Sequence, residues 1–221
     1  MYEVIGRVSH ESLDEVSNRS TETILPRGAC LQEAIARLPM EGGVIRLGAY
    51  DYYVSSAISL TRDNVSIIGN GRSRIKHSGS AGTIFRVVAN GFRLERVRLF
   101  GTGSTAYALS LAGNNMYIKD VAFEDVGACV TGSNCESLVI EGCRSDTVDP
   151  VNYLINLSNC DRATVIGNNL YDSTTRSVVI YATDTSGHGT YVGNIGNGDI
   201  SYKGSMNNAN AGNAGMGVVV R

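Results

Sequence analysis

The chain has 221 residues, enough for one domain with a sizeable core. Its net charge of −2 and the lack of any Lys/Arg-rich run argue against a nucleic-acid partner. Only 18% of the residues are charged, so Ser, Thr, Asn and Gly must keep the surface soluble. Glycine is abundant (26) and proline is rare (3), which is typical of an all-β chain with many tight turns.

The chain begins with a polar stretch, residues 1–25, that we interpret as an attachment arm. This stretch has neither a basic n-region nor an apolar h-region, so we expect no signal peptide and synthesis in the cytoplasm. No run of about 18 apolar residues occurs, and we therefore expect no membrane insertion.

The segment RGACLQEAIARLP, residues 27–39, predicts a short amphipathic helix. Apolar residues at i, i+3, i+4 and i+7 form its buried face: Leu31, Ala34, Ile35 and Leu38. Pro39 and the Gly42-Gly43 pair end this helix. The segments GVIRLG and YYVSSAISL that follow predict strands.

A repeat then runs through most of the remaining chain. Similar segments align on apolar residues that lie 22 to 26 positions apart: Leu94, Ile118, Ile140, Ile166 and Val192. A second apolar set between them gives each repeat at least two short strands. A repeat near 24 residues with strands and no helix indicates a parallel β-helix. A β-sandwich would also space its strands regularly, but it gives no reason for a repeated motif.

We therefore predict an all-β fold, a right-handed parallel β-helix over residues 26–204, with a short N-terminal capping α-helix. The open end of a solenoid exposes unpaired backbone groups and core side chains, so terminal repeats need a cap. The helix over residues 31–38 is placed to cover that end. Residues 205–221, rich in Gly, Asn and Ala, are expected to form a C-terminal tail or an oligomer contact.

The stretch CLQEAIARLPMEGGVIRLGAYDYYVSSAISLTRDNVSIIGNG, residues 30–71, resembles the opening of pectin-lyase-like right-handed β-helix proteins. In that superfamily a capping helix precedes a glycine break, a strand, a Y-x-V strand and an I-x-G-x-G turn. The resemblance covers roughly residues 28–200. It implies the fold but not one function, since the superfamily includes lyases, hydrolases, esterases and bacteriophage tailspikes.

Two short strings are similar to polygalacturonase motifs: RIK, residues 74–76, and GHG, residues 187–189. Their order is reversed relative to that family, and its paired Asp motif is absent. We therefore interpret Arg74 and Lys76 as solvated turn residues, and His188 as part of a Gly-rich turn.

Carboxylates recur six residues past the aligned apolar position. They are the low-ranked catalytic candidates Glu124, Asp146 and Asp172. Stacked on successive coils, they would lie about 5 Å apart, close enough to raise one pKa, attract a cation or act as a retaining glycosidase pair. They could equally point apart into water. Tyr171 offers a flat ring for a sugar, and Arg144 is the nearest basic residue in sequence. We take these two as binding candidates.

The five cysteines include no C-x-x-C pair, so we predict small buried hydrophobes rather than a zinc site. No metal and no cofactor are expected. The sequence favours a spike or fibre component on the virion or particle surface. Its arm would bind other particle proteins, and its β-helix would bind a surface polysaccharide. The resemblance also implies that the protein is a homotrimer. The alternatives are a polysaccharide lyase or glycoside hydrolase, and a purely architectural particle protein.

Overall fold

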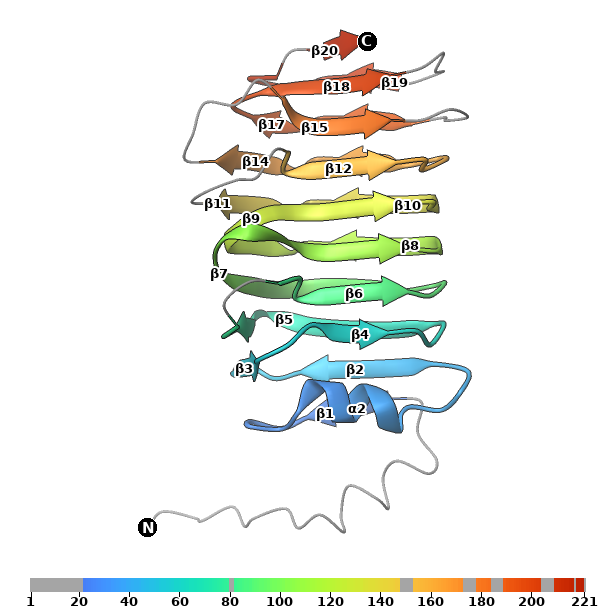
Figure 1. The fold of residues 1–221 in the computed structure, drawn as a ribbon, viewed down its shortest axis with the longest axis vertical. Coiled ribbons are helices and arrows are strands. Elements are labelled where there is room, and N and C mark those ends of the chain that lie inside the picture. The colour runs from blue at the N-terminus through green and yellow to red at the C-terminus, as the bar shows by residue number, and fades with distance from the viewer. Residues whose placement is uncertain are drawn as a thin grey trace.

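The computed structural model describes residues 22–79, 82–147, 153–172, 178–183, 189–203, 209–216 and 218–220. Successive coils stack along one axis, with helix α2 and strand β1 at one end and strand β20 at the other (Figure 1). All described strand pairs are parallel, which makes the molecule a β-solenoid. The prediction of an all-β parallel β-helix with a short N-terminal helix is confirmed.

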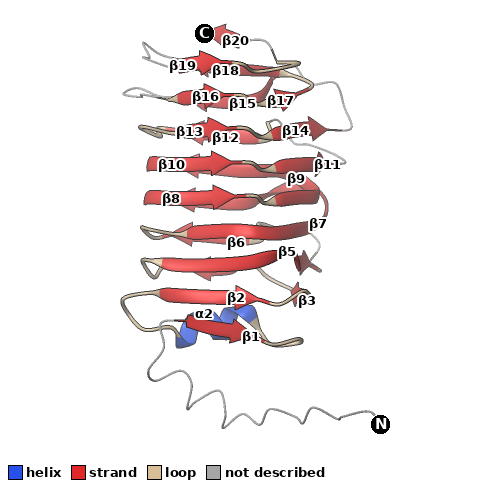
Figure 2. Cartoon of the chain, turned by 180° about the vertical axis from the view of Figure 1, so that it is seen from behind, coloured by secondary structure: helices blue, strands red, loops and turns tan. Residues whose placement is uncertain are grey.

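The coils have three faces, because the strand pairings fall into three parallel ladders. The first face consists of β1 (Glu22–Leu25), β2 (Gly43–Leu47), the start of β5 (Val65–His77), the start of β7 (Arg93–Ala112), β8 (Asn114–Lys119), β10 (Glu136–Glu141), β13 (Thr164–Ile166), β16 (Thr190–Val192) and β19 (Ala209–Ala211). Figure 2 shows this face, with β8 and β10 toward the viewer.

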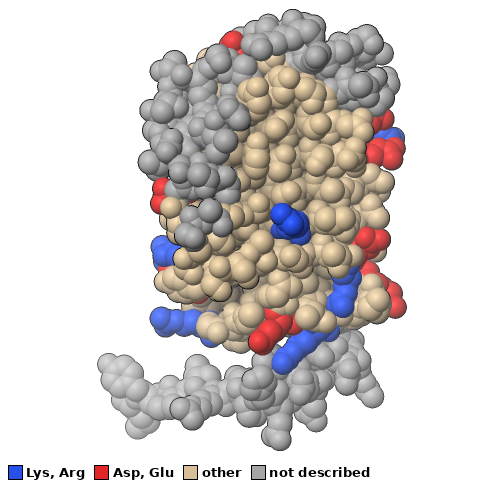
Figure 3. Space-filling view, viewed as in Figure 1, with Lys and Arg blue, Asp and Glu red and all other residues tan. Residues whose placement is uncertain are grey.

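The second face follows the first along the chain. It consists of β3 (Asp51–Val54), the end of β5, the middle of β7, the start of β9 (Ala122–Ser133), β11 (Arg144–Thr147), β14 (Asn169–Asp172) and β17 (Ile195–Gly196). The third face consists of β4 (Ile58–Leu60), β6 (Phe85–Val88), the ends of β7 and β9, β12 (Ile155–Ser158), β15 (Val178–Thr183), β18 (Asp199–Lys203) and β20 (Val218–Val220). The third face is largely uncharged where Figure 3 shows it.

The core consists of apolar columns that run along the axis of the solenoid. One column on the first face contains Ile45, Ile67, Leu94, Ile118, Ile140, Val165 and Tyr191. None of these side chains is more than 2% exposed. Alternate residues of each strand point inward, and coil stacking places like residues in contact. The repeated apolar set of the sequence is therefore the wall of this core.

The structure corrects the alignment of the repeat by one residue. Ile140 pairs with Val165, whereas Ile166 pairs with Glu141 on the outer side. Val165 and Ile166 are both apolar, so composition alone did not show which of them points inward. A slip of one residue moves every side chain after it to the opposite face.

Helix α2 (Leu31–Arg37) covers the N-terminal end of the solenoid, as predicted. It buries Leu31 and Ile35 and contacts β1 and β4. The guanidinium of Arg62, on the next coil, donates a hydrogen bond to the carbonyl oxygen of Ile35 at 3.0 Å. The carbonyl oxygen of Ala36, in the last turn of the helix, accepts a further hydrogen bond from Arg62 Nη2 at 3.4 Å. No helix among the described residues is long and apolar enough to span a membrane.

Both termini of the solenoid differ from the expected boundaries. Residues 22–25, which we assigned to the arm, form β1 and pair with β2 in the first ladder. Part of the expected tail, residues 205–221, also belongs to the ladders, because β19 pairs with β16 and β20 pairs with β18. Residues 1–21 of the arm lie outside the described residues.

An internal asparagine ladder closes the corner between the first and second faces in the C-terminal coils. Asn168 and Asn194 are fully buried. The side-chain amide of Asn168 donates a hydrogen bond to the side-chain oxygen of Asn194 at 2.9 Å. The side-chain amide of Asn194 in turn donates to the side-chain oxygen of Asn213 at 3.1 Å. In earlier coils this corner holds Val97, Val121 and Cys143 instead. Burial raises the pKa of the Cys143 thiol to about 12, so it behaves as a small apolar side chain.

Candidate functional site

Charged and aromatic side chains form one outward column along the second face. In register, successive coils contribute Tyr53, Lys76, Phe100, Glu124, Asp146 and Tyr171. The Lys76 ammonium lies 5.8 Å from the centroid of the Tyr53 ring and 5.4 Å from that of Phe100. We call this set the second-face column. Because strands of neighbouring coils lie about 4.8 Å apart, the column is a rigid ladder of regularly spaced groups.

The stack of three carboxylates is corrected to a pair. Glu124 and Asp146 are in register on neighbouring coils, as predicted. Asp146 then pairs with Tyr171, and Asp172 pairs with Thr147 one position further along. Asp172 therefore belongs to the neighbouring position of the ladder, and the register slip described above is the reason. Tyr171, predicted as a binding residue, falls in the column and is 45% exposed.

Glu124 is not a free carboxylate. Arg98 donates two hydrogen bonds to it, from Nε at 2.7 Å and from Nη2 at 2.9 Å. This fork raises the pKa of Arg98, chiefly through the hydrogen bonds to Glu124. A retaining glycosidase needs one protonated and one ionised carboxyl group. Both oxygens of Glu124 are occupied by the guanidinium of Arg98, so this carboxyl group is engaged in a structural ion pair.

Arg74 and Lys76 lie in strand β5 rather than in a turn. Both form ion pairs with Asp51 of the preceding coil, at 2.5 Å from Arg74 Nε and 2.8 Å from Lys76 Nζ. The structure therefore corrects our interpretation of them as solvated turn residues, because stacking places an acidic partner directly beside them. His188, the other residue of the polygalacturonase-like strings, lies outside the described residues. No group of three or more His, Cys, Asp or Glu side chains that could hold a metal occurs in the described part of the chain.

The Asp51 cluster makes stability depend on acid pH. The hydrogen bond from Lys76, followed by that from Arg74, lowers the pKa of Asp51 below its ordinary value of 3.8, against the opposing effect of burial. A depressed folded-state pKa contributes stability above the unfolded-state pKa, and this stability is lost as pH falls through the folded-state value. We expect Asp51→Asn to be less stable than wild type at pH 7, with the difference shrinking once the pH falls below 3.8 and vanishing only below the lower folded-state pKa of Asp51. Urea unfolding at several pH values measures this. A constant difference across the range would contradict it.

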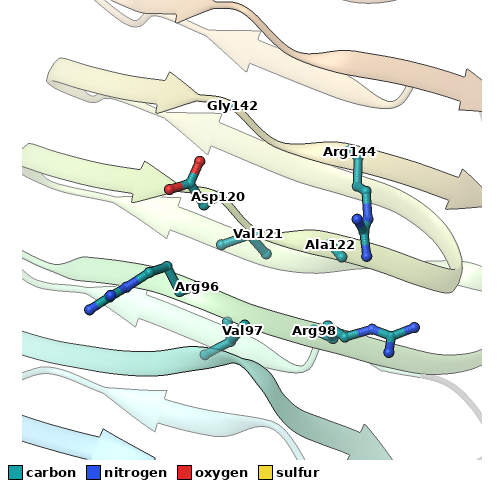
Figure 4. Close-up of a pocket in the computed structure, with 9 residues that line it drawn as sticks. Arg96, Val97, Arg98, Asp120, Val121, Ala122, Gly142 and Arg144 are labelled. Atoms are coloured by element: carbon teal, nitrogen blue, oxygen red, sulfur yellow. The ribbon is translucent and has the colours of Figure 1, made fainter.

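A hollow of about 260 Å³ lies at the corner between the first and second faces. Four successive coils line it with Gly71, Arg96, Val97, Arg98, Asp120, Val121, Ala122, Gly142 and Arg144. Ala122 stands between Arg98 and Arg144 in the ladder. Its methyl group is only 4% exposed, so the neighbouring side chains cover it. Figure 4 shows the Arg144 side chain extending toward Ala122 and the Arg98 coil.

The corner residue has a left-handed backbone conformation in the successive coils from Arg96 to Gly212. Glycine supplies it in Gly142, Gly167, Gly193 and Gly212, whose φ angles lie between 62° and 64°. Arg96 and Asp120 occupy the same corner in two earlier coils, each with a φ of 52°. A bulky residue at positive φ is uncommon, because Cβ then crowds the following carbonyl. The conformation is therefore unfavourable for Arg96, whereas an aspartate such as Asp120 adopts it more readily.

The sequence analysis missed Arg96 and Asp120. They lie two residues past Leu94 and Ile118, and the register of the structure aligns them with Gly142, Gly167 and Gly193. The sequence alignment, off by one residue in the later repeats, placed Asn168 and Asn194 in this column instead, so a glycine column was not visible before the structure. Ala122, which lines the hollow, could not be recognised without the register that stacks it between two arginines.

The hollow favours an anion. Its lining carries three arginines and one aspartate, a formal charge of +2. Arg98 is already paired with Glu124. No ion pair or side-chain hydrogen bond involves Arg96 or Arg144 within the described residues. Two guanidinium groups thus retain unused donors beside an open space, and guanidinium forks bind carboxylate and phosphate oxygens in bidentate fashion.

The fold defines the class of protein as a parallel β-helix. No protein-family model matches the chain, and no curated protein matches it. Among solved structures, the chain is similar to one described as ORF18 of Geobacillus virus E2, with a TM-score of 0.59 and 15% identity. The match covers 84% of this chain and 46% of that one, so this chain spans just under half of its length. At this identity the likeness concerns the fold, and membership of the pectin-lyase-like superfamily stays a prediction.

Proposed function

We propose that this protein is a structural component of a bacteriophage particle whose β-helix contacts a surface glycan. The second-face column carries the proposal. It presents exposed aromatic rings between charged groups on a rigid ladder, and rings with polar neighbours suit stacking on sugars. The likeness to the Geobacillus virus E2 protein, over most of this chain, supports the association with a phage. The arm, residues 1–21, is proposed to attach the chain to the particle, and a homotrimer is the proposed assembly.

Binding of sugars to the column is tested by exchanging matched tyrosines. Tyr171 lies in the column and is 45% exposed, whereas Tyr50 lies in the turn between β2 and β3 and is 44% exposed. We expect Tyr171→Ala to weaken binding to the polysaccharide selected from a panel of bacterial surface glycans, and Tyr50→Ala to leave it unchanged. Loss of a stacking ring should reduce affinity about tenfold. Isothermal titration calorimetry measures this. Equal affinities for both variants, or no binding to any glycan, would overturn the proposal.

Incubating the protein with the same polysaccharide distinguishes binding from cleavage. New reducing ends or unsaturated products that vanish in the double variant Glu124→Gln, Asp146→Asn would make the protein a polysaccharide-degrading enzyme instead. We expect none, because Glu124 is held by Arg98 as an ion pair.

An immunogold label on the purified phage, lost when residues 1–21 are deleted, would support the proposed attachment. Absence of label on particles that carry the full chain would contradict it.

A further inference from the structure

We infer that Cys135 and Cys160 form a reactive dithiol, which closes to a disulfide that links two successive coils of the solenoid. Both cysteines belong to the same short motif, Ser-Asn-Cys followed by an acidic residue, in residues 133–136 and 158–161. The asparagines of the two copies are 25 residues apart, which is one coil of the repeat. Strands β10 and β13, which follow the two copies, are paired neighbours on the first face (Figure 2).

The backbone pairing of the two copies places the cysteines side by side. Ser133 pairs with Ser158, and Glu136 pairs with Asp161 three residues further along. Between these pairings, the backbone N–H of Asp161 donates a hydrogen bond to the carbonyl oxygen of Cys135 at 2.9 Å. The two cysteines therefore occupy the same position of neighbouring coils, whose strands lie about 4.8 Å apart. A disulfide needs Cα atoms about 4.4 to 6.8 Å apart, so the coils are already at the required separation.

The two thiols lie beneath a surface turn between the third and first faces. Both cysteines are buried, whereas the asparagine before each of them is exposed. Asn134 and Asn159 have nearly the same left-handed φ, 53° and 54°, and the Asn159 amide donates to the side-chain oxygen of Asn134 at 2.7 Å. The two turns thus have the same shape and direct their cysteine side chains alike. Local opening of this turn brings the thiols into contact with solvent.

The two sulfur atoms interact directly. A hydrogen bond from the Cys160 thiol lowers the pKa of Cys135, against the opposing effect of burial. The same hydrogen bond, followed by burial, raises the pKa of Cys160. The Cys160 sulfur also lies against the coil of Cys135, because a Cβ built on Gly132 would lie 3.3 Å from it. Since the thiolate is the nucleophile in disulfide exchange, Cys135 is the attacking residue and Cys160 the resolving one.

The other cysteines are arranged differently, and the structure describes all five. On the neighbouring coils, Cys143 is flanked by Val121 and Asn168 rather than by a second thiol. Cys129 lies inside strand β9, and Cys30 is exposed ahead of helix α2. The repeated motif therefore selects one pair of cysteines and gives Cys143 as a buried control.

Closure requires a small disulfide as oxidant, and oxidised glutathione is the probe. The Cys135 thiolate attacks one glutathione sulfur, which breaks the glutathione S–S bond, releases one glutathione thiolate and leaves a mixed disulfide on Cys135. The Cys160 thiol gives its proton to the released thiolate, and its sulfur attacks Cys135 and displaces the second glutathione. That glutathione takes up the proton that Cys135 had lost. Two protein thiols are thus oxidised while one glutathione disulfide is reduced to two thiols.

The link would form after folding. A dithiol persists in a reducing cytoplasm, whereas a particle outside the cell meets oxidising conditions. Closing a loop of one coil restricts the unfolded chain and therefore stabilises the folded solenoid. This timing rests on the proposed particle role, whereas the reaction of the dithiol does not depend on it.

The test incubates the full chain with oxidised glutathione and then alkylates it with N-ethylmaleimide under denaturing conditions. Two of the five thiols should be protected, and non-reducing peptide mapping should find one link, between Cys135 and Cys160. The melting temperature should rise by at least about 5 °C and return to its starting value with dithiothreitol. Cys143→Ala, which removes a buried thiol outside the pair, should show the same protection and the same rise. Cys160→Ala should show neither.

Each outcome supports or overturns the pair. Alkylation of all five thiols after oxidation, glutathione retained without an internal link, or links through Cys30 or Cys143 would overturn it. A link between Cys135 and Cys160 that lowers the melting temperature would contradict the in-register geometry. The peptide map of the wild-type chain decides without any variant, so misfolding of Cys160→Ala leaves the test intact. Because the purified chain is oxidised without glycan or particle, failure of the proposed function leaves this result unchanged.

Discussion

Gly113→Ala should destabilise the solenoid by about 3 kcal/mol, whereas Gly167→Ala should cost only about 1 kcal/mol. Gly113 lies between β7 and β8 with a φ of 142°, and a Cβ built on it would lie 2.2 Å from the carbonyl oxygen of Ala89. That atom belongs to the backbone of the preceding coil, so relief requires the coils to move apart. Gly167 has a φ of 63°, but its Cβ would meet no atom within 4 Å.

The two substitutions introduce the same methyl group into different surroundings. The φ of 63° at Gly167 lies in the left-handed region that other residues can adopt, whereas a φ of 142° is essentially restricted to glycine. Backbone strain and the close approach of two coils therefore both raise the cost at Gly113. Urea unfolding monitored by circular dichroism gives both free energies. Equal losses for Gly113→Ala and Gly167→Ala would show that coil stacking at Ala89 is loose. The prediction therefore tests the packing that also fixes the spacing of the second-face column.

The sequence predicted those features that depend on composition within one repeat. The apolar face of residues 31–38 predicted the capping helix, and the recurring apolar positions predicted stacked coils. These signals are strong because a buried position tolerates few residue types. The register between coils was not determined, because Val165 and Ile166 are equally apolar. Asp172 was placed in the carboxylate column for this reason, although the correct partner of Asp146 is Tyr171.

The hollow depends on how residues of different coils are placed side by side. Ala122 matters only because Arg98 and Arg144 stand on either side of it in neighbouring coils. These pairings join positions more than 20 residues apart in sequence, and no local pattern encodes them. Arg144 was named as a basic residue near the carboxylates, but its free guanidinium and its position over a hollow follow only from the stacking. The repeated pattern of apolar residues thus predicts the fold class. The hollow lies where single coils differ from that repeated pattern, and the repeat therefore does not predict it.

Asn194→Ala should destabilise the protein by about 3 to 4 kcal/mol, because it removes several buried hydrogen bonds at once. The Asn194 amide donates to the carbonyl oxygen of Val165 at 2.9 Å and to the side-chain oxygen of Asn213 at 3.1 Å. Its own side-chain oxygen accepts from the backbone N–H and the side-chain amide of Asn168, at 3.1 and 2.9 Å. Removal leaves these partners buried without hydrogen bonds, which costs more than the bonds themselves contribute.

A matched control and a double variant make this prediction specific to the ladder. Asn169, next in sequence to Asn168, is exposed on the second face, so Asn169→Ala should change stability by less than about 0.5 kcal/mol. Asn168→Ala combined with Asn194→Ala should cost clearly less than the two single changes together, because the side chains share a bond. Additive losses in urea unfolding would mean that the amides act independently. The ladder therefore ties the C-terminal coils to one another, and with them the strand β14 that presents Tyr171.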